Sequence, residues 1–138
     1  MILGIGTDIL NMQLLGECSL APSDPFLLRT YSQKEQKEAA ARQDSTAYYA
    51  TRFAAKEALF KALYAAAGPL PDSAPKKGAE MEILTLENGA PSVHLHGNAK
   101  ERALSMGVTR IHLSLSYNTP YAVAFAVLEG ESGNELSD

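Results

Sequence analysis

Hydrophobic and polar positions repeat with a different period in each half of the chain. Apolar residues recur at helical spacing through much of the first half, and they alternate singly with polar residues in the second half, as in half-buried strands. The first ten residues, MILGIGTDIL, are mostly apolar and predict a buried strand. Asp8 interrupts this strand, and a carboxylate there is costly unless it is paired, hydrogen-bonded or bound to a metal.

Capping signals and a glycine-proline stop predict two helices in the first half. Ser32 and Glu35 fit a capping box, so a helix is expected over 32–42. Ser45 or Thr46 is expected to cap the longest helix, which ends near residue 67 before a Gly-Pro stop signal. Loops are predicted by composition at 19–25 and 69–78.

The second half predicts a hairpin, a short helix and two more strands. The Asn88-Gly89 pair is a hairpin signal between two alternating segments. Asn98 is expected to cap the helix and Gly107 to end it. The expected elements are strand 80–86, strand 91–97, helix 98–106, strand 109–117 and strand 121–129. Together these predict an α+β fold, a small antiparallel sheet packed on one long helix, with a single domain over 1–129 and a flexible tail over 130–138.

Composition narrows the class of protein. The chain has 138 residues and a formal net charge of -4, which argues against nucleic-acid binding through bulk positive charge. No apolar run reaches the ~20 residues of a membrane span, and the N-terminus does not resemble a signal peptide. Cys18 is the single cysteine, so a cytoplasmic protein without an internal disulfide is expected. Four of the acids lie in the last ten residues, and residues 1–128 hold twelve acids and twelve bases.

The long helix carries the densest chemical signal, a stripe at helical spacing made of Phe53, Glu57, Lys61 and Tyr64. Arg52 and Lys56 form an adjoining pair of cations. One interpretation is an exposed helix face whose Glu57–Lys61 pair contributes only ~0.3–0.5 kcal/mol. The other is that Glu57 and Asp8 hold a hard cation such as Mg²⁺, while the cations neutralise phosphate groups. The residues alone leave both open.

Two motifs resemble one known family. Residues 4–9 (GIGTDI) and residues 52–62 (RFAAKEALFKA) are similar to those of holo-acyl-carrier-protein synthase, the small trimeric type of 4′-phosphopantetheinyl transferase. The similarity spans nearly the whole chain except the loop near 69–79 and the tail. It implies that coenzyme A donates its 4′-phosphopantetheine arm to a serine of an apo acyl-carrier protein, releasing 3′,5′-ADP.

The resemblance also implies the metal and the catalytic residues. Asp8 and Glu57 would bind Mg²⁺ against the pyrophosphate of coenzyme A, and Lys61 would contact the phosphate under attack. The general base would be Glu57 or a metal-bound water, and the sequence does not choose between them. The nucleophile belongs to the carrier, so no nucleophilic Ser-His-Asp set is required here.

Five further residues are assigned to the nucleotide by the same resemblance. Arg52 and Lys56 would line the nucleotide pocket, Gly89 and Pro91 would border the adenine, and His112 matches a histidine of the family's penultimate strand. The family places its sites between the subunits of a homotrimer. No nucleic acid or membrane partner is expected, and fatty-acid, polyketide and peptide synthesis all remain open as the carrier's pathway.

Several positions depart from the family pattern. Tyr117 stands where the family often has a histidine, Ala90 where a lysine is common, and residues 11–17 lack a basic residue. These changes fall on substrate contacts rather than on the metal pair, which suggests retained chemistry with altered carrier preference or weaker coenzyme A affinity. The alternatives are a degenerate module that binds coenzyme A or a carrier without transfer, and a structural trimeric subunit, which would leave the acid pair unexplained.

Overall fold

The computed structural model describes residues 1–16, 24–64 and 78–131, and its strands form two antiparallel sheets. The larger has the order β1-β5-β4, built from β1 (Ile2–Asn11), β5 (Tyr121–Gly130) and β4 (Val108–Asn118). The smaller is the hairpin of β2 (Met81–Thr85) and β3 (Pro91–Leu95). The predicted single small sheet is therefore two sheets, within the predicted α+β class.

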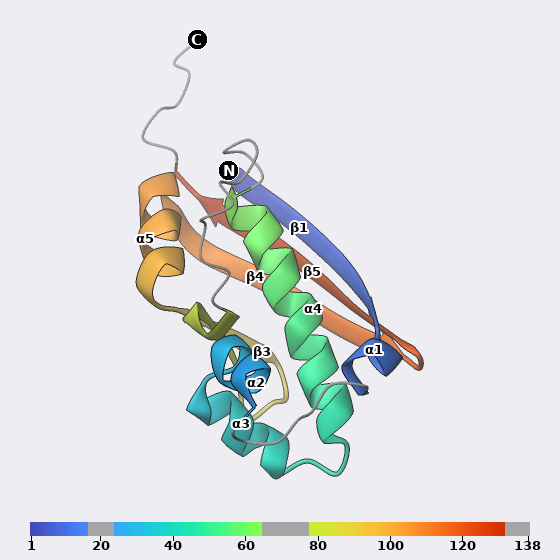
Figure 1. Cartoon of the computed structure of the whole chain (residues 1–138). Helices are drawn as coiled ribbons and strands as arrows, with labels where there is room; N and C mark the ends of the chain where they lie inside the picture. Colours follow the sequence, from blue (N-terminus) through green and yellow to red (C-terminus); the bar gives the residue numbers. More distant parts are fainter. Residues whose placement is uncertain (17–23, 65–77, 132–138) are drawn as a thin grey trace.

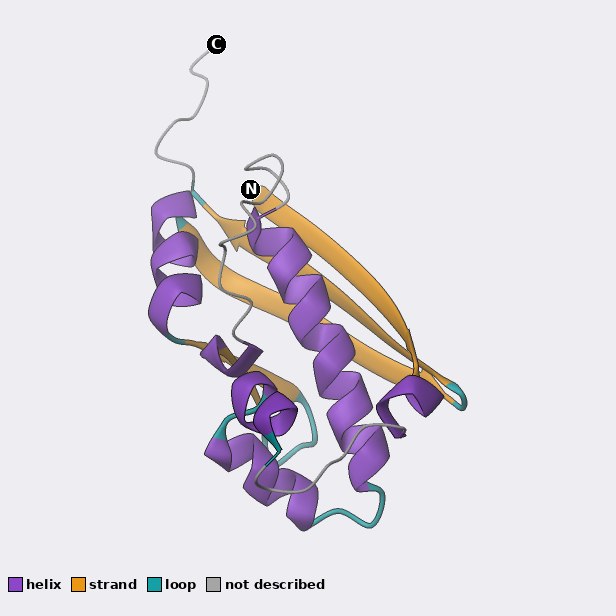
Figure 2. Ribbon diagram, viewed as in Figure 1, coloured by secondary structure: helices purple, strands orange, loops and turns teal. Residues whose placement is uncertain are grey.

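The helices gather on one side of the larger sheet, where α4 (Ser45–Tyr64) runs along β1, β5 and β4 (Figures 1 and 2). The remaining helical segments are α1 (Met12–Gly16), α2 (Pro25–Thr30), α3 (Gln33–Ala40), the 3-10 turn η2 (Gly78–Glu80) and α5 (Gly97–Met106). Helices α2 and α3 lie beside the hairpin at one end of α4, and α5 lies near the opposite end of the fold (Figure 1).

Small residues let α4 approach the sheet closely. The face of α4 toward the sheet includes four alanines that are fully or almost fully buried: Ala54, Ala55, Ala58 and Ala62. On β1, a Cβ added at Gly6 would collide with the backbone carbonyl of Ala58, and one at Gly4 with that of Ala62. Three successive inward positions of β5 are also buried alanines, Ala122, Ala124 and Ala126, before Leu128 takes the next one. This backbone-to-backbone contact fixes β1, and hence Asp8, against α4.

The other face of the larger sheet is uncovered in the single chain, and it is apolar along β1 and β5 but polar along β4. Its side chains alternate with the buried ones along each strand, as the pleat requires. Ile5, Ile9, Val123 and Phe125 are between 39% and 66% exposed. Exposed apolar residues gathered on one sheet face are typical of an interaction surface.

A second cluster of buried side chains sits where α2, α3 and the beginning of α4 meet. Tyr31 and Tyr49 pack with ring centroids 4.6 Å apart, and the Tyr31 hydroxyl donates to the Tyr49 carbonyl over 2.7 Å. Leu27 is almost fully buried there. This cluster anchors α3, which the capping box predicts, and α2, which the sequence does not predict.

Several boundary predictions are confirmed. Ser32 and Glu35 form the capping box of α3, with both reciprocal hydrogen bonds present. Gly107 ends α5 in the left-handed region at φ 86°, and Gly89 adopts φ 87° in the hairpin turn. Strand β5 continues to Gly130, one residue beyond the predicted domain boundary, while residues 132–138 of the predicted tail lie outside the described residues.

Two predicted caps are wrong. Asp44, not Ser45 or Thr46, caps α4, since its carboxylate accepts a hydrogen bond from the Ala47 amide over 3.0 Å. Helix α5 begins at residue 97, so Asn98 lies inside it. The Glu80 carboxylate serves there instead, accepting from the Ala99 amide over 3.3 Å. In both places a carboxylate oxygen accepts from an amide of the first helical turn, and its negative charge also complements the positive end of the helix. The predicted end of the long helix near residue 67 lies outside the described residues.

Candidate active site

Asp8 faces α4 because it shares one face of β1 with the two close-packed glycines, Gly4 and Gly6. Lys61 reaches across from α4 and donates to Asp8 Oδ1 over 3.2 Å and to the Thr7 carbonyl over 3.0 Å. The Asp8 side chain is 17% exposed and that of Lys61 53% exposed. The carboxylate that interrupts the first strand is therefore paired, and its pair opens to solvent.

Glu57 lies one helical turn before Lys61 on the same face of α4 and is half-buried. It lines a cavity of about 250 Å³ together with Phe26, Arg29, Thr30, Phe53, Lys56, Phe60, Gly78 and Met81. The walls are mostly apolar. The structure thus joins Asp8 to Lys61 directly and places Glu57 next to both an ion pair and a small cavity.

The donor set of Asp8 and Glu57 suits a hard divalent cation. Mg²⁺ is commonly held by one or two carboxylates, and substrate phosphates and waters fill the remaining positions. Within the described ranges no three His, Cys, Asp or Glu side chains converge as a ready-made metal cage. The two carboxylates therefore fit an ion that shares its ligands with a phosphorylated substrate.

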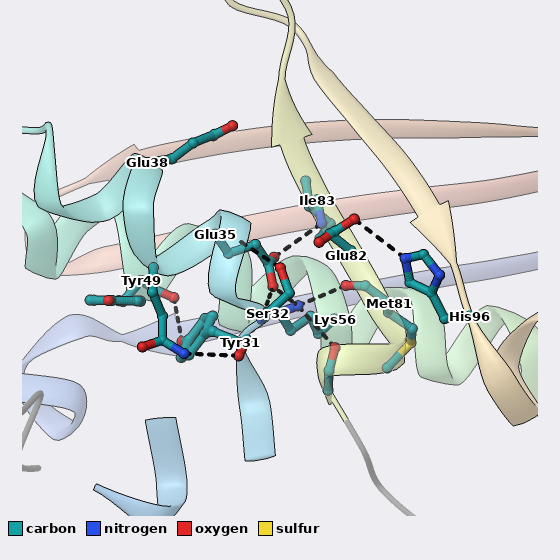
Figure 3. Close-up of polar contacts among 12 residues, drawn as sticks. Tyr31, Ser32, Glu35, Glu38, Tyr49, Lys56, Met81, Glu82, Ile83 and His96 are labelled. Atoms are coloured by element: carbon teal, nitrogen blue, oxygen red, sulfur yellow. Dashed lines mark hydrogen bonds and ion pairs between the residues drawn. The ribbon is translucent and has the colours of Figure 1, made fainter. Parts of the chain in front are cut away.

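Lys56, in contrast to Lys61, is buried in a polar network (Figure 3). Its ammonium donates to Glu35 Oε1 over 2.9 Å, to the Gly78 carbonyl over 2.9 Å and to the Met81 carbonyl over 2.7 Å. Burial lowers the pKa of Lys56, and the adjacent Glu35 carboxylate opposes that change. The three cations predicted to gather around Glu57 are in fact engaged at three different places on α4.

Glu35 has a second role that the sequence does not reveal. Beyond capping α3, its fully buried carboxylate accepts from Lys56 and, through Oε2, from the Ile83 amide over 3.0 Å. The capping box signal identifies its local bond only, because the other two partners lie 21 and 48 residues further along the chain.

Arg52 packs against β2 of the hairpin together with Arg42. Arg52 and Arg42 both donate to the Thr85 hydroxyl, over 2.8 and 3.2 Å, and both guanidinium groups lie over the Tyr48 ring. The Thr85 hydroxyl in turn donates to Glu38 over 2.8 Å. Arg52 Nε is buried without a hydrogen-bond partner among the described residues. Arg42 was not singled out by the sequence, since its neighbours belong to other elements.

Three of the residues assigned to the nucleotide surround one cavity. Arg52, Gly89 and Pro91 line a space of about 220 Å³ together with Thr51, Leu115, Ser116 and Tyr117. The Tyr117 side chain, which stands in place of the family's histidine, is part of this wall. The structure therefore brings the hairpin turn, α4 and the end of β4 together at one place.

His112 lies apart from that cavity. Its side chain is on the outward face of β4, as the alternation of the strand predicts, and it pairs with Glu129 across the sheet at 3.0 Å. That hydrogen bond lowers the pKa of Glu129. His112 therefore stands beside the uncovered apolar face rather than beside Arg52 in the single chain.

Comparison with known proteins identifies the family. Residues 4–126 match the model of the 4′-phosphopantetheinyl transferase superfamily. The chain belongs to this superfamily. The expected family and the α+β fold of 4′-phosphopantetheinyl transferases are thereby confirmed.

Relatives of this transferase cover almost all of its length. The holo-[acyl-carrier-protein] synthase of Natranaerobius thermophilus is 35% identical over 128 residues, 93% of this chain and 98% of the relative. That of Anaeromyxobacter dehalogenans strain 2CP-C is 38% identical over 135 residues, 94% of this chain and 98% of the relative. Among solved structures, the ACPS-CoA complex of Chronobacterium ammoniagenes has a TM-score of 0.80 at 29% identity, covering 92% of this chain and 96% of that one.

No helix in the described part of this transferase is long and apolar enough to cross a membrane. The longest, α4, instead buries its apolar side chains against the sheet and against α2 and α3, and it exposes Lys61.

Proposed function

We propose that this protein transfers the 4′-phosphopantetheine arm of coenzyme A to a serine of an apo acyl-carrier protein, releasing 3′,5′-ADP, in a Mg²⁺-dependent reaction. The observation that carries the proposal is the contact between Lys61 and Asp8 across α4 and β1, with Glu57 one turn away. An exposed cation paired with one carboxylate, with a second carboxylate one helical turn away, supplies the charged groups that phosphoryl transfer needs.

Asp8 and Glu57 are the residues that would hold Mg²⁺. The bound ion would supply neutralisation of charge on the pyrophosphate of coenzyme A. Lys61 would place its positive charge beside the phosphate under attack. The hydrogen bond from the Lys61 ammonium to Asp8 holds that ammonium in position before the substrate binds. For the general base, Glu57 or a metal-bound water, the lining of the cavity by Glu57 supports Glu57 as the residue that would accept the serine proton.

The nucleotide half of coenzyme A is assigned to the cavity between the hairpin turn and α4. Arg52 offers the guanidinium, with one buried nitrogen still unpartnered among the described residues. Gly89 and Pro91 present a turn without a large side chain. Tyr117 supplies a hydroxyl but no positive charge, which supports weaker coenzyme A binding than a histidine would give.

The functional protein is proposed to be a cytoplasmic homotrimer of single domains spanning 1–129, with sites between subunits. The support is the uncovered sheet face of Ile5, Ile9, Val123 and Phe125, which a neighbouring subunit would bury. His112 borders this face, so trimer formation would bring it to the nucleotide of an adjacent subunit. The expected altered carrier preference remains part of this proposal, because residues 11–17 contain no basic residue.

The test is the intact mass of several apo-carriers after incubation with the protein, coenzyme A and Mg²⁺. The expected result is a gain of one phosphopantetheine that disappears without Mg²⁺ and with a folded Glu57→Gln variant. A fully active Glu57→Gln protein would refute the metal assignment. Coenzyme A binding without transfer to any carrier would favour the degenerate binding module instead, and ordinary rates on a common fatty-acid carrier would count against altered preference.

A further inference from the structure

Lys56 has no spare donor to offer a substrate. An ammonium group carries three hydrogens, and all three are directed to acceptors of the protein: Glu35, the Gly78 carbonyl and the Met81 carbonyl. The side chain is 3% exposed, and its nitrogen lies 5.4 Å above the Tyr31 ring. A phosphate could reach this nitrogen only after one of these bonds is broken inside the protein.

Glu35 completes the network from the other side. Its Oε1 accepts from the Ser32 amide and from Lys56, both over 2.9 Å, and its Oε2 accepts from the Ile83 amide over 3.0 Å. The two side chains together connect the beginning of α3, the middle of α4, η2 and β2 (Figure 3). A pair of buried charges therefore ties together three separate regions of the chain: α3, α4, and the consecutive segments η2 and β2.

The tied segments are also walls of the Glu57 cavity. Gly78 of η2 and Met81 of β2, whose carbonyls accept from Lys56, both line it, as does Lys56 itself. The wall has little room to shift, since a Cβ at Gly78 would lie 2.8 Å from the Thr30 carbonyl of α2. Loss of the pair would release η2 and β2 from α4 on the side where Glu57 stands.

We propose that Lys56 and Glu35 are positioning residues of the transfer reaction, which lock η2 and β2 against α4 and so fix the cavity wall that Glu57 shares. Lys56 does not bind a phosphate of coenzyme A. This assignment replaces its expected place in the nucleotide pocket, and it rests on the proposed role of Glu57.

The experiment compares three folded proteins: the wild type, the double variant Glu35→Gln/Lys56→Met, and Lys100→Met. The double variant removes both buried charges at once, so neither is left unpaired. Lys100→Met makes the same lysine change at an exposed position of α5 and serves as the matched control. The measurements are kcat for transfer to apo-carrier and the Kd of coenzyme A by calorimetry, with folding checked by circular dichroism.

The expected result is a split between binding and turnover. The double variant binds coenzyme A within about twofold of the wild type, while kcat falls by about tenfold to a hundredfold, since small misplacements of catalytic groups have effects of this order. The control changes neither value. A loss of coenzyme A affinity of tenfold or more would overturn the proposal by making Lys56 a ligand, and an unchanged kcat would overturn it by making the pair purely structural.

If the double variant does not fold, Glu35→Asp tests the positioning role instead. Glu35→Asp keeps the buried charge but is one methylene shorter, so its carboxylate cannot reach Ser32, Lys56 and Ile83 together. The same split, of smaller size, is expected, and the same two outcomes would overturn the proposal. Failure of the underlying function is separately visible, as absence of transfer by the wild type or full transfer by Glu57→Gln.

Discussion

Two lysines on one helix, five residues apart, occupy opposite kinds of site. Lys56 meets Glu35 at 2.9 Å, and the two side chains are 3% and 0% exposed. Lys61 meets Asp8 at 3.2 Å, and the two side chains are 53% and 17% exposed. Both are lysine-carboxylate pairs within the same motif, yet one is enclosed by backbone carbonyls and the other faces solvent. Burial, rather than residue type, separates a cation that supports the fold from one that is available to a substrate.

The largest expected effect is on stability at the buried site. Lys56→Met alone leaves the Glu35 carboxylate buried without its cation, which costs about 3–5 kcal/mol when one partner of a buried pair is removed. Chemical denaturation should therefore show a much lower free energy of unfolding than for the wild type. A loss of unfolding free energy below about 1 kcal/mol would mean that Lys56 is as exposed to solvent as Lys61.

The second effect is on catalysis at the exposed site. Lys61→Met should reduce kcat for transfer by about a hundredfold, because a charge that stabilises the reacting phosphate is lost. Its stability cost should stay within about 0–1 kcal/mol, since exposed ion pairs contribute little. If Lys61→Met unfolds readily but turns over normally, the two lysines have been assigned the wrong way round.

The third effect tests the close packing of β1 against α4, which positions Asp8. Gly6→Ala places a methyl group against the Ala58 backbone carbonyl, which cannot rotate away. Overpacking of this kind costs about 1–3 kcal/mol, so the midpoint of thermal unfolding should fall, and transfer should weaken as β1 shifts. Unchanged stability would show that α4 is not packed against β1 as closely as described.

The smallest effect concerns a third acid-base contact, between the buried Glu82 and the exposed His96 at 3.3 Å, which is an ion pair when His96 is protonated. Burial raises the pKa of Glu82, but hydrogen bonds from Ser32 and His96 and the charge of His96 outweigh it, so the pKa lies below its usual value. A carboxylate with a depressed pKa stabilises the fold above its unfolded pKa of about 4.3 and ceases to do so as pH falls through the folded pKa.

Stability should accordingly be followed from pH 7 downward in the wild type and in Glu82→Gln. The variant should be the less stable protein at neutral pH, and the difference should shrink once the pH drops below about 4.3. A constant difference across that range would show that the depressed pKa of Glu82 does not contribute.

Local patterns in the sequence predict the elements well where the deciding contacts are also local. The Ser32–Glu35 capping box, the left-handed Gly107 and the alternation that turns His112 outward all depend on neighbours within a few residues. The close approach of α4 to the sheet follows from the glycines of β1 and the alanines of α4. The motifs containing Asp8 and Glu57 identify the family.

What the sequence does not predict depends on distant partners. The acceptors that enclose Lys56 come from residues 35, 78 and 81, so a helical projection makes it an ordinary member of a cationic face. Arg42 meets Arg52 only because both reach Thr85, which lies on another element. Asp44 supersedes the neighbouring hydroxyl caps because carboxylates interact more favourably with a helix start.

The most direct test of the central claim, that Asp8, Glu57 and Lys61 form the transfer site, is an intact-mass assay with Asp8→Asn. The variant keeps the size of the side chain and leaves Lys56 and Glu35 untouched, so the protein should stay folded. With apo-carrier, coenzyme A and Mg²⁺, the wild type is predicted to add one phosphopantetheine and the variant to add almost none. Modification by the variant at the wild-type rate would contradict the claim.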